Sequence, residues 1–268
     1  MHKAQLIAVD MDGTFLNNEM DYDRRQFADL YPKMRAQGIQ FVVASGNQYY
    51  QLRSFFAGYP DIIFLSENGG LVRDAQRTYF QSTYTPDVAR KVAQVLTALP
   101  AVEWLAAGVN GAYVLRSSSD AFITDARDYY HRLQLIDRFD EIDDDIVKFS
   151  SHCPAHETAA YVARYHEQLA GFAVPTSSGH GDIDIIQPGI HKARGLAELG
   201  AQLDIPLQNM VTFGNGGNDI EMLQEAGLGV AMRNSPQDVL DVADAVTTDN
   251  NHSGVLTYIA DHILTANT

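Results

Sequence analysis

The chain has 268 residues, of which 46% are hydrophobic, and it carries a formal net charge of −15. This length allows one large domain or two, with a substantial buried core. The negative charge excludes a general nucleic-acid or anionic-membrane binder, because no basic stripe is present to neutralise phosphates. A small phosphate ligand held locally is still compatible with this composition.

Three further features of the sequence narrow the possible compartment and the possible metal chemistry of this protein. Cys153 is the only cysteine, so no internal disulfide is possible and nothing indicates an oxidising compartment. Residues 1–5 lead into an apolar strand without a signal-peptide hydrophobic region, and no apolar run is long enough to cross a bilayer. The histidines show no zinc-binding spacing. We therefore expect a cytoplasmic protein.

The first predicted element is a strand over Leu6–Val9, which ends in Asp10-Met11-Asp12-Gly13-Thr14. Residues i and i+2 of an extended backbone point to the same side, so Asp10 and Asp12 can approach one bound group. Two neighbouring carboxylates repel, and such a cluster is tolerated mainly where a cation or a proton sits. A divalent metal is the simplest explanation. Taken alone, the stretch is equally compatible with a turn in which aspartate caps its own backbone.

The next segments predict a βαβ unit. A strand is predicted over Gln40–Ala44, in which Phe41, Val42 and Val43 form a continuous apolar run, as is typical of a parallel strand covered on both faces. The preceding helix ends at Gly38, and Pro32 inside its pattern is expected to distort it or to move its start. Its buried face is predicted from four residues at helical spacing: Phe27, Leu30, Tyr31 and Met34.

The second strand ends in Ser45-Gly46-Asn47, just before a helix predicted over Gln48–Phe56. Ligands collect at this edge of open parallel sheets, and helix N-termini favour anions. Ser45 and Asn47 are therefore candidates for phosphate contact, for helix capping, or for both. A third buried strand over Ile62–Leu65 is followed by Glu67-Asn68-Gly69-Gly70 and a small hairpin.

From about Tyr84 to Gln187 the chain resembles an inserted α/β module. Helices are expected from 86, at 121–131 and around 162–169, and strands at 102–106, 112–115, 146–150 and 183–186. The acidic run 141–145 indicates a solvated loop more than a second metal site. The polar turn 177–181 is either a hairpin loop or a place of close ligand approach, and Asp182 and Asp184 alternate after it.

After the module, a helix begins near Lys192. A cation in a first helical turn opposes the helix dipole, so Lys192 indicates an anionic partner, the alternative being a surface lysine. A strand over Asn209–Phe213 then ends in Gly214-Asn215-Gly216-Gly217-Asn218-Asp219. A dinucleotide fingerprint would need glycine at 219, so that reading is rejected. Short strands and helices, with a final helical face at 256–263, complete the sheet.

Four motifs in this order resemble the haloacid dehalogenase superfamily of phosphatases, in its Cof-type branch, with bacterial sugar phosphatases nearest. They are Asp10-x-Asp12-Gly13-Thr14, Ser45 closing a strand, Lys192, and Gly214-x-x-x-Asn218-Asp219; residues 41–50 look especially like the sugar phosphatases. The resemblance covers nearly the whole chain. It implies an α/β fold with a Rossmann-like, mostly parallel core sheet covered by helices on both faces, over 1–83 and 188–268, and an inserted α/β cap domain over 84–187.

The resemblance also implies residue roles. Asp10 would attack phosphorus to form an aspartyl-phosphate, and Asp12 would protonate the leaving alkoxide and then deprotonate a water. Mg²⁺ would be held by Asp10, the backbone carbonyl of Asp12, and Asn215 and Asp219 of the fourth motif. Lys192 would neutralise charge during catalysis. The implied phosphate-binding residues are Met11, Ser45, Gly46, Asn47, Lys192 and Asn218.

The implied activity is a Mg²⁺-dependent phosphatase for small sugar phosphates, acting as a monomer or weak homodimer with no nucleic-acid or membrane partner. One departure matters, because the family usually has aspartate where this chain has Asn215. An amide oxygen binds Mg²⁺ without charge attraction, so weaker metal affinity is expected. The alternative is a phosphate-ligand binding or regulatory protein with weakened catalysis.

A compact signalling receiver is disfavoured by the long insertion. Asn47, Asn68 and the turn 179–181 are candidates for contact with the leaving group.

Overall fold

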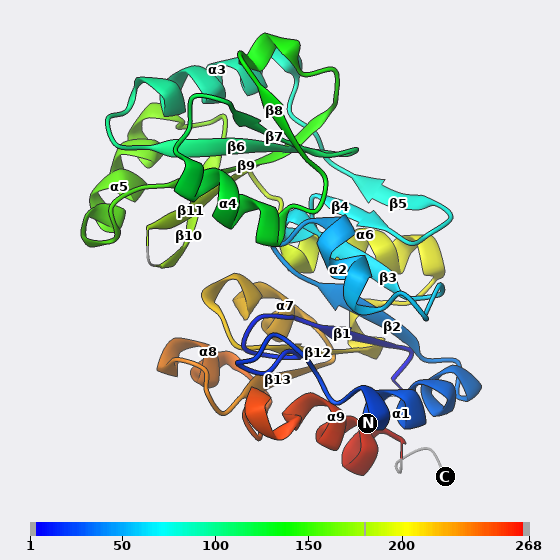
Figure 1. Cartoon of the computed structure of the whole chain (residues 1–268). Coiled ribbons are helices and arrows are strands. Elements are labelled where there is room, and N and C mark those ends of the chain that lie inside the picture. Colours follow the sequence, from blue (N-terminus) through cyan, green and yellow to red (C-terminus); the bar gives the residue numbers. More distant parts are fainter. Residues whose placement is uncertain (1–3, 180, 265–268) are drawn as a thin grey trace.

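The computed structural model describes residues 4–179 and 181–264, which form a larger sheet and a smaller sheet that lies above it in the view of Figure 1. The larger sheet has eight strands in the order β14-β13-β12-β1-β2-β3-β4-β5. Its first six strands pair in parallel, and the pairs β3–β4 and β4–β5 are antiparallel. The strands are β1 (Leu6–Val9), β2 (Gln40–Ala44), β3 (Ile63–Ser66), β4 (Leu71–Arg73), β5 (Thr78–Gln81), β12 (Met210–Gly214), β13 (Leu228–Met232) and β14 (Ala245–Thr247).

Helices cover both faces of this sheet, because alternate residues of the central strands are buried on opposite sides. Ile7 and Val9 of β1 pack in one core cluster with the helices α1, α2 and α9, whereas Leu6 and Ala8 pack in another with α6 and α7. The α/β class with a Rossmann-like core is therefore confirmed. The helices are α1 (Arg24–Ala36), α2 (Tyr49–Phe55), α6 (Lys192–Leu203), α7 (Ile220–Glu225), α8 (Gln237–Val242) and α9 (Gly254–Tyr258), the last continued by a π-helical turn (Ile259–Leu264).

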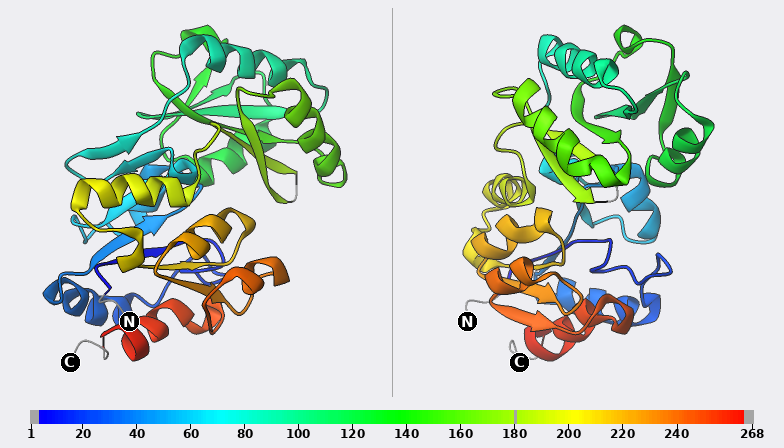
Figure 2. Two further views of the ribbon diagram at one scale, coloured as in Figure 1. Left: turned by 180° about the vertical axis from the view of Figure 1, so that it is seen from behind. Right: turned by 90° about the vertical axis from the view of Figure 1, so that its left-hand side faces the viewer.

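The smaller sheet has six strands in the order β10-β11-β9-β6-β7-β8. The helices α3 (Pro86–Ala98) and α5 (Thr158–Gln168) pack on one face and α4 (Asp120–Tyr129) on the other (Figure 2). The chain passes between the sheets at 82–85 and again at 187–191. The boundaries predicted at 84 and 187 fall in these connections and stay predictions. The strands are β6 (Glu103–Gly108), β7 (Ala112–Leu115), β8 (Leu133–Ile136), β9 (Ile146–His152), β10 (Val174–Gly179) and β11 (Asp182–Ile186).

Several local expectations differ from the structure. Pro32 lies inside α1, which begins at Arg24 after the Asp23 cap, so the proline does not displace the helix start. The lost backbone bond is offset because the face of α1 that includes Phe27 and Met34 is buried in the core. The sequence interpretation also missed β8 and β14, which are only partly buried and so lack a continuous apolar run. It read the second half of β10 as a turn, and His180 of that turn lies outside the described residues.

Candidate active site

Three strand ends bring the predicted site residues to one edge of the larger sheet. Asp10 directly follows β1, Ser45 directly follows β2, and β12 ends at Gly214. Because β1 pairs in parallel with both β2 and β12, these ends are neighbours. Gly13 in the turn after Asp10 has φ of +74°, and a Cβ atom there would lie 2.6 Å from the amide nitrogen of Asn215. Glycine is therefore required both for the turn and for the approach of the β12 loop.

Lys192 joins two carboxylates from different strand ends. It begins α6, is buried, and its Nζ donates to Asp10 Oδ1 at 2.7 Å and to Asp219 Oδ1 at 2.7 Å. Burial alone would lower the pKa of Lys192, but the two carboxylates raise it. Burial and the neighbouring Asp219 raise the pKa of Asp10 to about 7, against the opposing effect of Lys192. The predicted nucleophile and the predicted cationic residue are thus in direct contact.

Asp12 has one engaged and one free carboxylate oxygen. Its Oδ2 accepts a hydrogen bond from Asn47 Nδ2 at 2.8 Å, whereas its Oδ1 is buried without a hydrogen-bond partner. Burial raises the pKa of Asp12, although the hydrogen bond from Asn47 acts in the opposite direction. A carboxyl group with a raised pKa and a free oxygen is suited to carry a proton to or from a ligand.

The amide of Asn215 faces a ring of oxygen atoms. With Oδ1 toward this ring, it accepts a hydrogen bond from Thr14 Oγ1 at 2.7 Å. With Nδ2 there instead, the amide would donate to Thr14 Oγ1 at 2.7 Å, the Asp12 backbone carbonyl at 2.9 Å and Asp10 Oδ2 at 3.3 Å. In an octahedral Mg²⁺ site with bonds near 2.1 Å, adjacent ligand oxygens are about 3 Å apart. The oxygens of Asp10, Asp12 and Asn215 therefore have the chemistry and spacing for a small hard cation.

Asp219 is engaged elsewhere. One of its oxygens is held by Lys192, and the other accepts hydrogen bonds from the backbone N–H groups of Asn215 and Gly216, each at 2.9 Å. Its carboxylate therefore supports the loop and the lysine. In the described part of the chain, no group of three or more His, Cys, Asp or Glu side chains is arranged to hold a metal. A cation at this edge would rely on the amide oxygen of Asn215 and the carbonyl of Asp12.

The predicted phosphate-binding residues occupy the surrounding loops. Ser45 is buried and its Oγ accepts a hydrogen bond from the backbone of Asn47 at 3.1 Å. The buried Met11 accepts backbone hydrogen bonds through its carbonyl from Phe15 and Leu16, which shapes the acidic turn. Asn218, which was expected to bind phosphate, donates to Asn68 Oδ1 at 3.1 Å.

Two cap residues contact this edge but were not among the candidate site residues from the sequence. Lys148 of β9 donates to the carbonyl oxygen of Gly46 at 2.7 Å, and Asp184 of β11 accepts from Asn68 Nδ2 at 2.7 Å. A signal was available for the lysine, because it is the one charged residue of the otherwise apolar or small run 146–151. No such signal singled out Asp184, because Asp182 alternates with it on the same strand.

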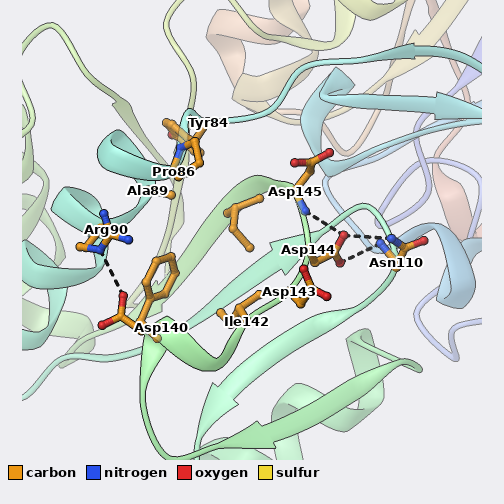
Figure 3. A pocket seen from close by; sticks show the side chains of 12 residues that line it. Tyr84, Pro86, Ala89, Arg90, Asn110, Asp140, Ile142, Asp143, Asp144 and Asp145 are labelled. Carbon is orange, nitrogen blue, oxygen red and sulfur yellow. Dashed lines mark hydrogen bonds and ion pairs between the residues drawn. The ribbon is translucent and has the colours of Figure 1, made fainter.

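A separate hollow of about 460 Å³ lies between α3 and the loop that precedes β9 (Figure 3). It contains none of the predicted site residues. Its acidic side chains include Asp140, which pairs with Arg90 at 3.1 Å, and Asp144, which accepts from the side chain of Asn110 at 3.0 Å. Asp144 of the acidic run 141–145 therefore has partners within the cap, and among the described residues no three acidic, His or Cys side chains are arranged here to hold a metal.

None of the helices in the described ranges has the length and apolar character needed to cross a bilayer.

Comparison with known proteins gives consistent matches over nearly the whole chain. A family model described as haloacid dehalogenase-like hydrolase matches residues 7–259. The chain is 43% identical over 256 residues to the 5-amino-6-(5-phospho-D-ribitylamino)uracil phosphatase YbjI of Escherichia coli (strain K12), covering 95% of this chain and 94% of that protein. It is 29% identical to the solved structure of SMU.1108c from Streptococcus mutans UA159, with a TM-score of 0.89 and coverage of 97% and 99%. The HAD subclass IIB sugar phosphatase BT4131, at 18% identity, a TM-score of 0.82 and coverage of 97% and 100%, shares the fold.

Proposed function

The chain belongs to the haloacid dehalogenase-like hydrolases, and we propose that it is a Mg²⁺-dependent phosphatase that hydrolyses a small phosphorylated sugar or sugar-like metabolite through an aspartyl-phosphate on Asp10. The observation that carries this proposal is the contact of buried Asp10 with Lys192, beside a second carboxyl group, Asp12, that keeps one free oxygen. A nucleophile, a cation and an acid are thereby assembled at one sheet edge.

In the proposed first step, a carboxylate oxygen of Asp10 attacks phosphorus while the bond from phosphorus to the leaving oxygen breaks. Asp12 gives its proton to that oxygen, so the product leaves as an alcohol. In the second step Asp12 takes a proton from a water, whose oxygen attacks phosphorus and releases Asp10 and inorganic phosphate. The raised pKa of Asp12 supports its protonated start.

Lys192 and the fourth motif supply the electrostatic part of the mechanism. Attack of a carboxylate on a phosphate dianion brings like charges together, and the ammonium of Lys192 offsets this repulsion. Asp219 holds that ammonium in place, since its Oδ1 accepts a hydrogen bond from Lys192 Nζ at 2.7 Å. Mg²⁺ would be held by Asp10, the Asp12 carbonyl and Asn215, and when bound it neutralises phosphoryl charge and aligns the group for in-line transfer.

The relative with 43% identity supports a specific first substrate to test. Its name gives a phosphate on an acyclic ribityl chain attached to a uracil ring. Such a chain is a sugar alcohol, so this substrate falls within the class expected from the sequence. We propose 5-amino-6-(5-phospho-D-ribitylamino)uracil as a substrate of this chain, ahead of cyclic sugar phosphates.

Initial rates on this compound, a panel of sugar phosphates and p-nitrophenyl phosphate test the proposal. We expect turnover that requires Mg²⁺ and that is lost in Asp10→Asn, because an amide cannot form the acyl phosphate. The exposed Asp137→Asn is the matched control, since Asp137 pairs with Arg116 at the cap surface. Tight phosphate binding without turnover on every compound would instead favour the regulatory alternative.

A further inference from the structure

The cap contacts the core at two points of the loop 45–48, which carries the predicted phosphate-binding residues Ser45, Gly46 and Asn47. Lys148 is 2% exposed and donates to the carbonyl of Gly46 at 2.7 Å. Gln48, two residues further along the loop, donates to the carbonyl of Arg132 at 3.2 Å and accepts from its backbone N–H at 3.0 Å. The segment between these points includes Asn47, which holds Asp12. The cap therefore contacts the loop on both sides of a residue that orients the proposed acid.

A second chain of contacts runs from the cap to the fourth motif through Asn68. Asp184 accepts from Asn68 Nδ2 at 2.7 Å, and Asn68 Oδ1 accepts from Asn218 Nδ2 at 3.1 Å. Asp184 is itself fixed by Ser150 Oγ at 2.9 Å and by Lys148 at 3.2 Å. The Asn68 amide thus bonds the cap through its nitrogen and the core residue Asn218 through its oxygen.

The backbone beneath this connection is strained. Glu67 and Asn68 both lie in the left-handed region, with φ of +52° and +56°. Glu67 is buried, 3.1 Å from Lys148, and its Oε1 has no hydrogen-bond partner. Left-handed non-glycine residues and an unpaired buried oxygen both cost free energy, and such features persist where the surroundings enforce them, often at functional sites.

Resting on the phosphatase proposed above, we propose that the cap residues Lys148 and Asp184 position the phosphate-binding residues of the core. Lys148 holds the carbonyl of Gly46 and thereby the loop that carries Ser45 and Asn47. Asp184 holds Asn68, which in turn fixes the amide of Asn218. Neither cap residue needs to touch the substrate. These two cap contacts complete the phosphate site: without them the loop loses its bond to Lys148, and Asn68, which bonds Asn218, loses its bond to Asp184.

Asp184 provides the sharper test, because positioning and simple electrostatics predict opposite signs. Removing a carboxylate near an anion site should strengthen phosphate binding if charge alone matters. We expect Asp184→Ala to weaken the binding of inorganic phosphate, measured by calorimetry with Mg²⁺ present, by about tenfold, the effect of losing a hydrogen bond to a charged group. Asp184→Asn keeps an acceptor oxygen for Asn68 and should recover part of this loss.

A double-mutant cycle with Asn68→Gly tests the route through Asn68. Glycine accepts the left-handed backbone without strain, so this variant removes only the connecting side chain. Asp184→Ala and Asn68→Gly should each lower kcat/KM for p-nitrophenyl phosphate about tenfold. The double variant should be as active as the less active of the two, because the two residues act as one unit. Asp137→Ala, which breaks an exposed pair in the same cap, should behave as wild type.

Wild-type phosphate affinity and kcat/KM in Asp184→Ala, with only a lowered melting temperature, would overturn the positioning role. If wild type shows no turnover, the phosphatase proposal fails, and the calorimetric comparison of wild type with Asp184→Ala still decides the positioning role. If wild type does not bind inorganic phosphate, the positioning role is overturned, whereas the phosphatase proposal is decided by turnover alone.

Discussion

Lys192 Nζ lies 2.7 Å from Asp10 Oδ1, and both side chains are buried. The same ammonium is also 2.7 Å from Asp219, so one cation serves two carboxylates. Removing one partner of a buried pair leaves an uncompensated charge, which costs more than the pair itself contributes. The stability of this edge therefore depends on Lys192 as much as its chemistry does.

We expect Lys192→Met to lower the free energy of unfolding by about 3–5 kcal/mol in the absence of metal. The double variant Lys192→Met/Asp219→Asn should recover part of that loss, because it removes one of the two unpaired carboxylates. Urea unfolding measures both. The exposed Lys33→Met on α1 is the control, with an expected change within about 0.5 kcal/mol. A Lys192→Met protein as stable as this control would contradict the buried pair.

The raised pKa of Asp10 predicts a pH dependence of stability. Its folded-state pKa is about 7 against an ordinary value of 3.8, chiefly because of burial and Asp219, so the folded protein holds this proton more tightly. The stabilisation of the folded protein by this bound proton is fully present below the ordinary pKa and is lost as pH rises through the folded-state pKa. In EDTA, the melting temperature of wild type should therefore fall between pH 4 and 7 relative to Asp10→Asn. Parallel curves for the two proteins would refute this assignment.

The free oxygen of Asp12 predicts a dependence on the leaving group. Asp12→Asn should reduce hydrolysis of an alkyl phosphate by about 10²- to 10⁴-fold, because the alkoxide leaves unprotonated. The first step with p-nitrophenyl phosphate needs less proton donation, whereas hydrolysis of the intermediate still needs a base. This variant should therefore release a burst of p-nitrophenol and accumulate phosphorylated protein, detected by rapid quench and intact mass. Equal losses on both substrates, without a burst, would argue against the acid–base role.

The oxygen ring around Asn215 predicts opposite effects of one substitution with and without metal. Asn215→Asp adds a charge to the proposed Mg²⁺ ligand, so the Mg²⁺ concentration for half-maximal activity should fall. In EDTA the added carboxylate lies beside Asp10 and the Asp12 carbonyl, and the melting temperature should fall below that of wild type. Asn251→Asp adds the same charge at an exposed position and should change neither quantity. Identical Mg²⁺ half-saturation in wild type and Asn215→Asp would reject the ligand role.

Local patterns predicted most of the core because burial and chain direction are encoded over short distances. Phe41–Ala44 are apolar and buried, as residues of a strand covered on both faces must be, and the structure has the strand at Gln40–Ala44 as predicted. The helix face that includes Phe27 and Met34 was likewise read from spacing and is buried. Partly exposed strands such as Leu133–Ile136 escaped prediction, since their pairing within the sheet, and not their own apolar pattern, makes them strands.

The sequence by itself determined that polar residues follow several buried parallel strands and that a lysine begins the helix after the insertion. Those properties depend on short segments of the chain. Parallel pairing then brings the carboxyl ends of the strands to one edge of the sheet. Only the tertiary structure decided which side chains meet there. Asp219 accepts hydrogen bonds from Lys192 and from backbone amides of its own loop. Asn218 donates to Asn68, and the cap residue Lys148 donates to the carbonyl of Gly46, 102 residues away in the chain. Such pairings depend on how the two parts of the chain are placed against each other and on which donors face which acceptors, and no periodicity within either segment records that geometry.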